Sequence, residues 1–92
     1  HLWNNKGFAL RSLKRYDEAI VCYDQAIAIN PDDNTARQNK GVALRLAGKW
    51  DEAIKFYNES ISRDPKNDIH WTNKGTFFRS IGKHEDAVEC YN

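Results

Sequence analysis

The strongest constraint on this chain is a sequence that repeats itself every 34 residues. The tripeptide Asn-Lys-Gly occurs three times at this spacing, beginning at Asn5, Asn39 and Asn73. Aligning residues 1–34 with 35–68 gives 13 identities in 34 positions, and aligning 1–24 with 69–92 gives 9 in 24. A period of this length indicates stacked copies of one small unit, because a single copy cannot bury its own apolar face.

Each period has the pattern of two short helices joined by a turn. In the first copy, Trp3, Gly7 and Leu10 recur at the i, i+4, i+7 spacing of one helix face. A second apolar stripe follows within residues 17–29, and it opens on two carboxylates, which favour a helix N-terminus. Pro31 then ends that helix. The connections are short, so the sequence predicts an all-α fold of antiparallel helix pairs.

The residues that recur are similar to those of the tetratricopeptide repeat. The first copy carries Trp3, Gly7, Tyr16, Ala19, Tyr23, Ala26 and Pro31; the second carries Gly41, Trp50, Ala53, Tyr57 and Pro65; the third carries Trp71, Gly75, Ala87 and Tyr91. The copies depart from the pattern at Arg37, Ser60 and His84. We expect the tyrosines and tryptophans at these positions to belong to the core.

The resemblance implies an α-solenoid of about 2.7 repeats (92 residues over a period of 34), wound as a right-handed superhelix. We expect one domain over residues 1–92, with repeats 1–34 and 35–68 and an incomplete repeat 69–92. It also implies that the first helix of each pair lines a concave groove that holds an extended peptide. The end that the incomplete repeat leaves open is expected to be apolar, and self-association through it is a further expectation.

The polar face of the first helices is the candidate binding surface. Advancing about 100° per residue places it opposite the Trp3–Gly7–Leu10 stripe in all three copies. The predicted peptide-binding residues are Asn4, Asn5, Phe8 and Arg11; Gln38, Asn39, Val42 and Arg45; and Thr72, Asn73, Thr76 and Arg79. Phe8 and Val42 offer apolar contact on this face.

Two rows within this face suggest what it binds. An asparagine row (Asn5, Asn39, Asn73) offers amides that both donate and accept, as a peptide backbone requires. It resembles the asparagine ladder of some superhelical family members. An arginine row (Arg11, Arg45, Arg79) can hold carboxylates in two-point contacts. For both rows the alternative interpretation is a set of solvated helix residues copied by duplication.

Charge is segregated along the repeat although the net charge is only +1. The three spans that hold the first helices and their turns, 1–16, 35–50 and 69–84, contain no acidic residue and 11 of the 14 basic residues. A groove wall without carboxylates favours an acidic, extended protein partner. The alternative is that basic first helices pair with acidic second helices. The three repeated lysines (Lys6, Lys40, Lys74) are expected to lie outside the groove, with stems across apolar surface or ammonium groups near a second-helix carboxylate.

Other functions have less support in the sequence. Chaperone-binding relatives hold a C-terminal carboxylate with lysine, asparagine, asparagine, lysine and arginine, but the matching positions here are Asn4, Phe8, Asn39, Ile69 and Asn73, so only Asn39 agrees. Single-stranded RNA is the alternative ligand of a basic groove. It is disfavoured because the aromatic Phe8 becomes Val42 and Thr76 in the other copies.

No residue pattern points to catalysis or to a bound cofactor or metal. The three histidines (His1, His70, His84) are scattered, and Cys22 and Cys90 occupy equivalent places two repeats apart. Apolar residues make up 40% and charged residues 29%, and no apolar run approaches the length of a membrane span. We therefore expect a non-catalytic, cytoplasmic interaction module, and we interpret the chain as a fragment of a longer protein because it contains no methionine.

Overall fold

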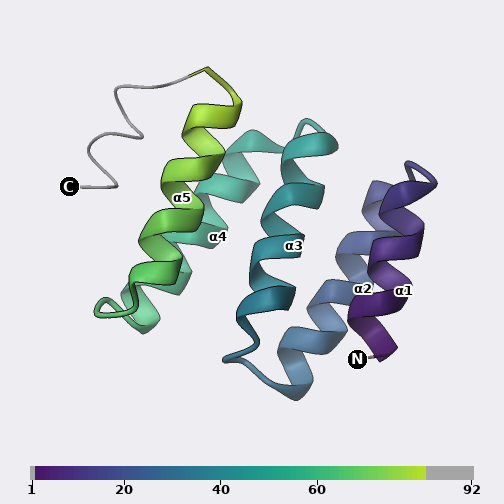
Figure 1. Cartoon of the computed structure of the whole chain (residues 1–92), viewed down its shortest axis with the longest axis horizontal. Coiled ribbons are helices and arrows are strands. Elements are labelled where there is room, and N and C mark those ends of the chain that lie inside the picture. The colour runs from purple at the N-terminus through teal and green to yellow at the C-terminus, as the bar shows by residue number, and fades with distance from the viewer. Residues whose placement is uncertain (1, 83–92) are drawn as a thin grey trace. The chain divides into compact units, whose positions relative to one another are not determined.

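A computed structural model describes residues 2–82, which form five α-helices and no strand (Figure 1). The helices are α1 (Leu2–Ser12), α2 (Tyr16–Ile29), α3 (Asn34–Leu46), α4 (Trp50–Arg63) and α5 (Asp68–Ser80). The predicted all-α fold class of helix pairs is confirmed. The chain divides into two compact units, His1–Lys49 with α1 to α3 and Trp50–Asn92 with α4 and α5. The expected grouping of all repeats into one domain stays a prediction.

The helices begin and end where the repeat pattern placed them. Asp17 and Glu18 lie in the first turn of α2, and α4 likewise carries two acidic residues in its first turn. α2 ends at Ile29, two residues before Pro31. The predicted second helix of the third copy, together with His84 and Cys90, falls outside the described residues.

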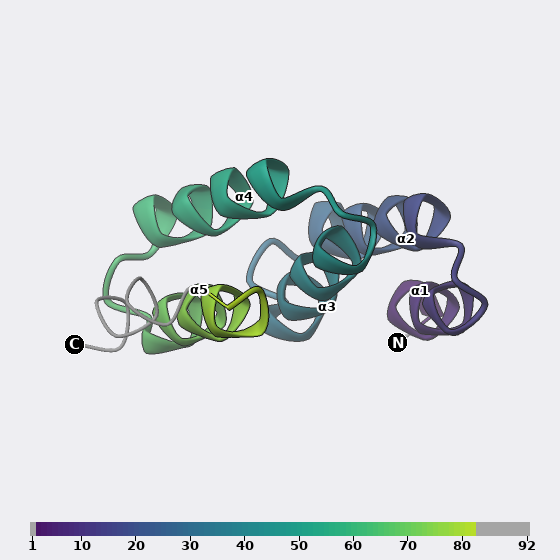
Figure 2. The same cartoon turned by 90° about the horizontal axis from the view of Figure 1, so that it is seen from above.

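In the first unit, α2 forms one layer while α1 and α3 lie together in the other (Figure 2). α2 packs against both neighbours, and α1 also contacts α3. The centre is a buried cluster of Ala19, Tyr23 and Ala43, with Leu10 and Ile20 packed against it. Small residues from α2 and α3 thus surround one large aromatic ring, which lets the three helices approach one another closely.

Gly7 is the point of closest approach between α1 and α2. A Cβ atom added at Gly7 would stand 2.6 Å from Cε1 and 2.8 Å from Cζ of the Tyr23 ring. Contacts that short do not occur between carbon atoms, so a side chain at residue 7 requires the ring to move. The expectation that Gly7 is a packing residue is confirmed.

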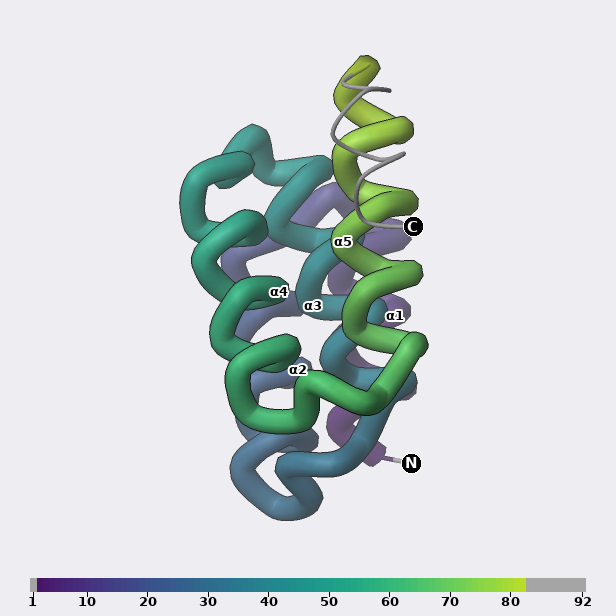
Figure 3. The backbone as a smooth tube through the Cα atoms, turned by 90° about the vertical axis from the view of Figure 1, so that its left-hand side faces the viewer, coloured from purple at the N-terminus to yellow at the C-terminus, as the bar shows by residue number. Residues whose placement is uncertain are grey.

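In the second unit, α4 and α5 run antiparallel side by side (Figure 3). Their contact is aromatic: the Tyr57 ring centroid lies 5.7 Å from that of Phe77 and 5.9 Å from that of Phe56. Phe78 adds an edge-on contact to Phe77 at 5.6 Å. Such tilted pairs contribute beyond the area they bury, so this unit is held by ring contacts where the first uses alanines.

The expectation that the repeat-defining aromatics are core holds for Tyr23 and Tyr57 but is wrong for two tryptophans. Trp50 is 47% exposed and Trp71 is 37% exposed. Trp71 begins its helix beside the preceding turn, and its Nε1 donates a hydrogen bond to the carbonyl oxygen of Pro65 at 3.1 Å. A side chain that bonds to a surface turn stays partly in solvent, which explains the difference.

The turn that follows each first helix uses a left-handed residue at the same repeat position. Lys14 (φ 62°), Gly48 (φ 76°) and Gly82 (φ 84°) are 34 residues apart. After α1, the amide of Arg15 donates to the carbonyl of Leu10 at 2.9 Å, and Lys49 repeats this bond to Leu44. Glycine adopts this conformation without strain, whereas lysine does not.

Candidate functional site

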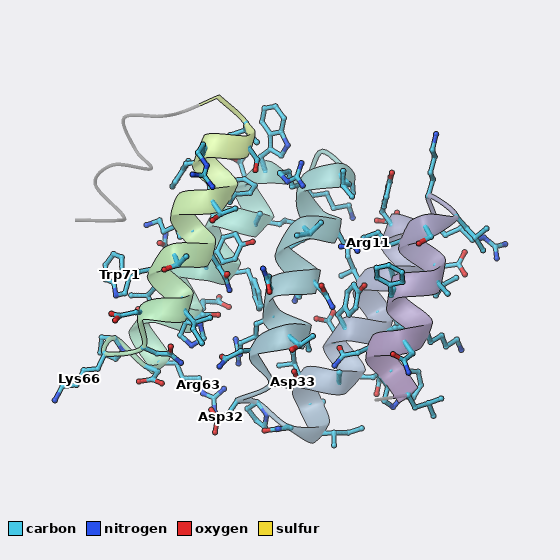
Figure 4. All side chains as sticks on the ribbon, in the orientation of Figure 1. Arg11, Asp32, Asp33, Arg63, Lys66 and Trp71 are labelled. Atoms are coloured by element: carbon cyan, nitrogen blue, oxygen red, sulfur yellow. The ribbon has the colours of Figure 1, made fainter. Side chains whose placement is uncertain are left out.

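The most exposed apolar side chain of the predicted site is Phe8 on α1, which is 53% exposed. The Arg11 guanidinium lies over its ring, with Cζ 4.9 Å from the ring centroid. Arg11 projects from the side of α1 that faces α3 (Figure 4). Because a guanidinium stacked on a ring keeps its N–H groups at its edge, the pair presents apolar surface and charged donors together.

Asn4 and Asn5 are neighbours in sequence but have different environments. Asn5 is exposed. Asn4 is buried, and its Nδ2 donates to Oδ2 of Asp33 at 3.0 Å, while Asp33 Oδ1 accepts from the amide of Ala36 and caps α3. Asn4 therefore ties α1 to the start of α3. Its Oδ1 is buried and has no hydrogen-bond partner within the described part of the chain.

The capping residue Asp33 is one that sequence reasoning missed. Asn67 stands 34 residues later and caps α5 in the same way, accepting a hydrogen bond from the amide of Ile69 at 3.0 Å. Asp or Asn directly before a helix is a recognisable N-cap signal, and its recurrence at the repeat spacing could have revealed it.

The α3 residues of the predicted site lie on the helix that contacts α1 in the first unit. Gln38 is exposed, whereas Asn39, Val42 and Arg45 are half-buried. The first unit therefore brings two polar helix faces together, with Phe8 and Arg11 on one and the two amides on the other.

The α5 residues belong to the second unit and are described by themselves. Thr72, Thr76 and Arg79 are exposed, but Asn73 is buried. Exposure of the asparagine row thus falls from Asn5 through half-buried Asn39 to Asn73. The copies of this row do not have equal access to solvent, although their sequences are the same.

The repeated lysines adopt the predicted arrangement. Lys6 Nζ lies 5.6 Å from the centroid of the Trp3 ring, and Lys74 Nζ lies 5.9 Å from that of Phe78. Lys40 Nζ is 2.6 Å from Oδ1 of Asp24 on α2, which is the second-helix carboxylate that we expected for this position. These lysines contribute to packing and pairing within their units.

Part of the charge segregation is explained by pairing between helices. In addition to the Lys40–Asp24 pair, Lys49 Nζ lies 3.1 Å from Oδ1 of Asp17 on α2, and Arg15 pairs with Glu18 at 3.5 Å. Acidic second helices therefore neutralise several basic residues of the first helices. The pairs are solvent-exposed to different degrees, so their contribution to stability is small.

Tyr23 carries the one resolved pKa shift among residues 2–82. Burial raises the pKa of its hydroxyl above the ordinary value, and the nearby charge of Arg11 partly offsets this. The hydroxyl is buried and, within those residues, makes no hydrogen bond. Tyr23 is therefore a packing residue whose polar end is unsatisfied.

Two other properties bear on the class of site. Among residues 2–82, no group of three or more His, Cys, Asp or Glu side chains is placed to hold a metal ion. None of the helices in that range combines the length and apolar composition needed to cross a bilayer. Cys22 is a free, buried thiol.

Comparison with known families agrees with the repeat pattern. One tetratricopeptide-repeat profile matches residues 2–33 and again 35–67, and a second profile of the same description matches residues 56–89. No curated protein matches the chain in sequence.

Several solved structures have the same fold. A crystal structure of MamA is 25% identical with a TM-score of 0.72, and the match covers 97% of this chain and 52% of that one. A second MamA structure (AMB-1) is 24% identical with a TM-score of 0.67, covering 97% and 53%. The second TPR of Spaghetti (RPAP3), bound to the HSP90 peptide SRMEEVD, is 24% identical with a TM-score of 0.71, covering 97% and 82%. The present chain thus spans about half of the MamA chains it matches.

Proposed function

This chain belongs to the tetratricopeptide-repeat family, and we propose that its first unit binds an extended, acidic protein segment along the polar faces of α1 and α3. The family consists of protein-interaction scaffolds that are typically without catalytic activity. The observation that carries the proposal is the stacked pair of Phe8 and Arg11. An exposed ring of this size on a small domain is a recognition feature when a charged donor lies beside it.

Phe8 and Arg11 select two features of the bound segment. The Phe8 ring accepts an apolar side chain, and the edge of the Arg11 guanidinium accepts a neighbouring carboxylate in a two-point contact. Stacking on the ring holds the guanidinium in place, so less side-chain entropy is lost on binding. A segment that alternates acidic and apolar residues fits this pair.

The α3 face supplies backbone contacts and further apolar surface. Gln38 and Asn39 offer amides that can pair with a peptide backbone, and Val42 adds an aliphatic contact. Asn5 provides the same chemistry from α1. Asn4 and Asn73 are buried, so we leave them out of the binding set, whereas Thr72, Thr76 and Arg79 of α5 stay in it as exposed residues of the second unit.

The similar RPAP3 structure supports a peptide ligand of this kind. That protein has the same fold and is bound to a peptide, SRMEEVD, that contains two glutamates and ends in aspartate. The present chain keeps only one of the five clamp positions expected for chaperone tails, at Asn39. We therefore propose an internal acidic segment as the ligand, held by Phe8 and Arg11.

Fluorescence polarisation with labelled peptides tests this proposal. The probe is an extended peptide with leucine flanked by glutamates, compared with the same peptide carrying glutamines. We expect Arg11→Gln to weaken binding of the acidic probe about ten-fold and to leave the glutamine probe unchanged. Phe8→Ala should weaken both. Val21→Ala on α2 is the matched control, because Val21 is also an exposed apolar residue.

Two results would overturn the proposal. One is equal binding of both probes by wild type and Arg11→Gln. The other is tighter binding of a single-stranded RNA, with a steep dependence on salt concentration. A pull-down with the full-length protein gives a second test, since Asn39→Ala/Arg45→Ala should reduce partner capture if the α3 face participates.

A further inference from the structure

One face of α1 is apolar and exposed on the side away from the proposed peptide site. It consists of Leu2, Lys6, Ala9 and Leu13, and we call it the outer face of α1. Leu2 is 75% exposed and Leu13 is 68% exposed, which makes them the two most exposed large apolar residues of the first unit. α1 lies at the edge of that unit, with α2 and α3 on one side of it (Figure 1).

The 34-residue period shows what covers this face elsewhere in the unit. The corresponding residues of α3 are Ala36, Lys40, Ala43 and Ala47. Ala36 and Ala43 are completely buried, and Ala43 packs against Ala19 and Tyr23 of α2. Lys40 pairs with Asp24, also on α2. On α3, therefore, this face is covered by the helix that precedes it in the chain.

The second unit repeats the arrangement with different residues. The corresponding positions of α5 are His70, Lys74, Phe77 and Ile81. His70 and Phe77 are buried, and the Phe77 ring packs on Tyr57 of α4. In both units a second helix covers this face of a first helix, and its tyrosine is a central contact. The outer face of α1 carries equal or larger apolar residues at these positions, yet it is exposed.

We propose that the outer face of α1 binds an amphipathic helix of the α2 type, supplied by a further tetratricopeptide helix pair. The helix would present an alanine, a tyrosine four residues later and an aspartate directly after it, as α2 does with Ala19, Tyr23 and Asp24. The alanine and tyrosine cover Ala9 and the two leucines. The aspartate pairs with Lys6, as Asp24 pairs with Lys40.

Charge selects this partner over a second copy of the same face. In a symmetric dimer through the outer face of α1, the two Lys6 ammonium groups would be brought together, and the face has no carboxylate to separate them. Like charges in contact oppose association. A helix that carries aspartate after its tyrosine supplies the missing charge. This surface is separate from the Phe8–Arg11 site, and the inference does not depend on the proposed peptide.

An extended chain tests the inference. A second copy of residues 16–34 is joined directly before His1, in the register that residues 16–34 have before residue 35. Hydrogen exchange of the α1 amides is compared with that of the original chain. We expect the added helix to slow exchange in α1 about ten-fold, because covering the face suppresses local opening. A control extension, with serine and aspartate in place of the copied alanine and tyrosine, should give no protection.

Charge reversal provides the decisive comparison. Lys6→Glu lies on the surface and does not disturb the fold, and it should remove part of the protection given by the extension. Lysine in place of the copied aspartate should then restore it. Unchanged exchange in the extended chain would overturn the inference, as would full protection with Lys6→Glu. Sedimentation showing that the original chain dimerises, and that Leu13→Gln abolishes the dimer, would assign the face to a second copy instead.

Discussion

The Nε atom of Arg37 donates a hydrogen bond to the carbonyl oxygen of Pro31 at 2.7 Å. Trp71, which occupies the same repeat position, donates from Nε1 to the carbonyl oxygen of Pro65 at 3.1 Å. A guanidinium and an indole thus place an N–H at the same point of the turn between repeats. Arg37, which departs from the family pattern in residue type, keeps the hydrogen bond that tryptophan makes in the next copy.

Replacing Arg37 tests how much this bond contributes. Arg37 is buried, so Arg37→Leu should lower the free energy of unfolding by about 1–3 kcal/mol, because the donor is removed and the Pro31 carbonyl loses it. Arg37→Trp should lose less, since indole supplies the same N–H. Urea unfolding followed by circular dichroism measures both. If leucine is tolerated as well as tryptophan, packing rather than the hydrogen bond holds this turn.

Gly7→Ala should destabilise the first unit although alanine is the better helix former. Without the neighbouring ring, the change would stabilise a helix by about 1 kcal/mol. With the new Cβ 2.6 Å from the Tyr23 ring, we expect a net loss of about 1–3 kcal/mol. The loss should shrink in a Tyr23→Leu background, which a double-mutant cycle of unfolding free energies would detect. An equal loss in both backgrounds would contradict the contact.

Tyr23→Phe should be neutral or stabilising near neutral pH, by up to about 1 kcal/mol. The hydroxyl is buried without a partner in the described residues, so its removal costs no hydrogen bond and relieves an unsatisfied group. Melting curves of the two proteins at pH 7 give the difference. A clear loss of stability in the phenylalanine variant would mean that the hydroxyl is satisfied in solution.

The same residue predicts alkaline sensitivity. Burial raises the folded-state pKa of Tyr23 above its unfolded value of about 10. Its contribution is therefore fully present below pH 10 and is lost as the pH rises through the folded pKa, because only the unfolded chain releases the proton easily. The free energy of unfolding should fall less steeply above pH 10 in Tyr23→Phe than in wild type. Parallel pH profiles would show that other groups dominate.

Lys14→Gly should stabilise the turn between α1 and α2. Lys14 has φ 62°, and the corresponding positions in the next copies, Gly48 and Gly82, use glycine for the same conformation. Left-handed geometry costs a residue with a Cβ about 1–2 kcal/mol, part of which glycine returns as unfolded-state entropy. We expect a gain of about 0.5–1 kcal/mol in thermal or urea unfolding. Lys14→Ala keeps the Cβ and is the control that should show no such gain.

Much of the fold could be predicted from the repeat alone. The spacing of Trp3, Gly7 and Leu10, the carboxylates at Asp17 and Glu18, and Pro31 after α2 placed the first helix pair to within a residue or two. These signals are local, because each depends on periodicity, helix-end chemistry or a proline in the chain itself. The packing role of Gly7 and the pairing of Lys40 with α2 also followed, since both need only the helix geometry and the order of the helices.

The candidate site was predicted less completely because repetition in sequence does not give equal surroundings. Asn5, Asn39 and Asn73 are identical in type and register, yet one is exposed and another buried. Only the neighbours of each helix decide this, and the first copy has neighbours different from those of the others. For the same reason Asn4 became a link to Asp33 and Trp71 stayed at the surface.

By itself, the sequence determined the helices, their pairing and the family, because these depend on a period that every copy shares. The tertiary structure decided which copies of a repeated residue are accessible, that Phe8 and Arg11 act as one stacked pair, and that the outer face of α1 is exposed. Those properties depend on which atoms come together across helices. A one-dimensional pattern that repeats cannot distinguish one copy's neighbours from another's.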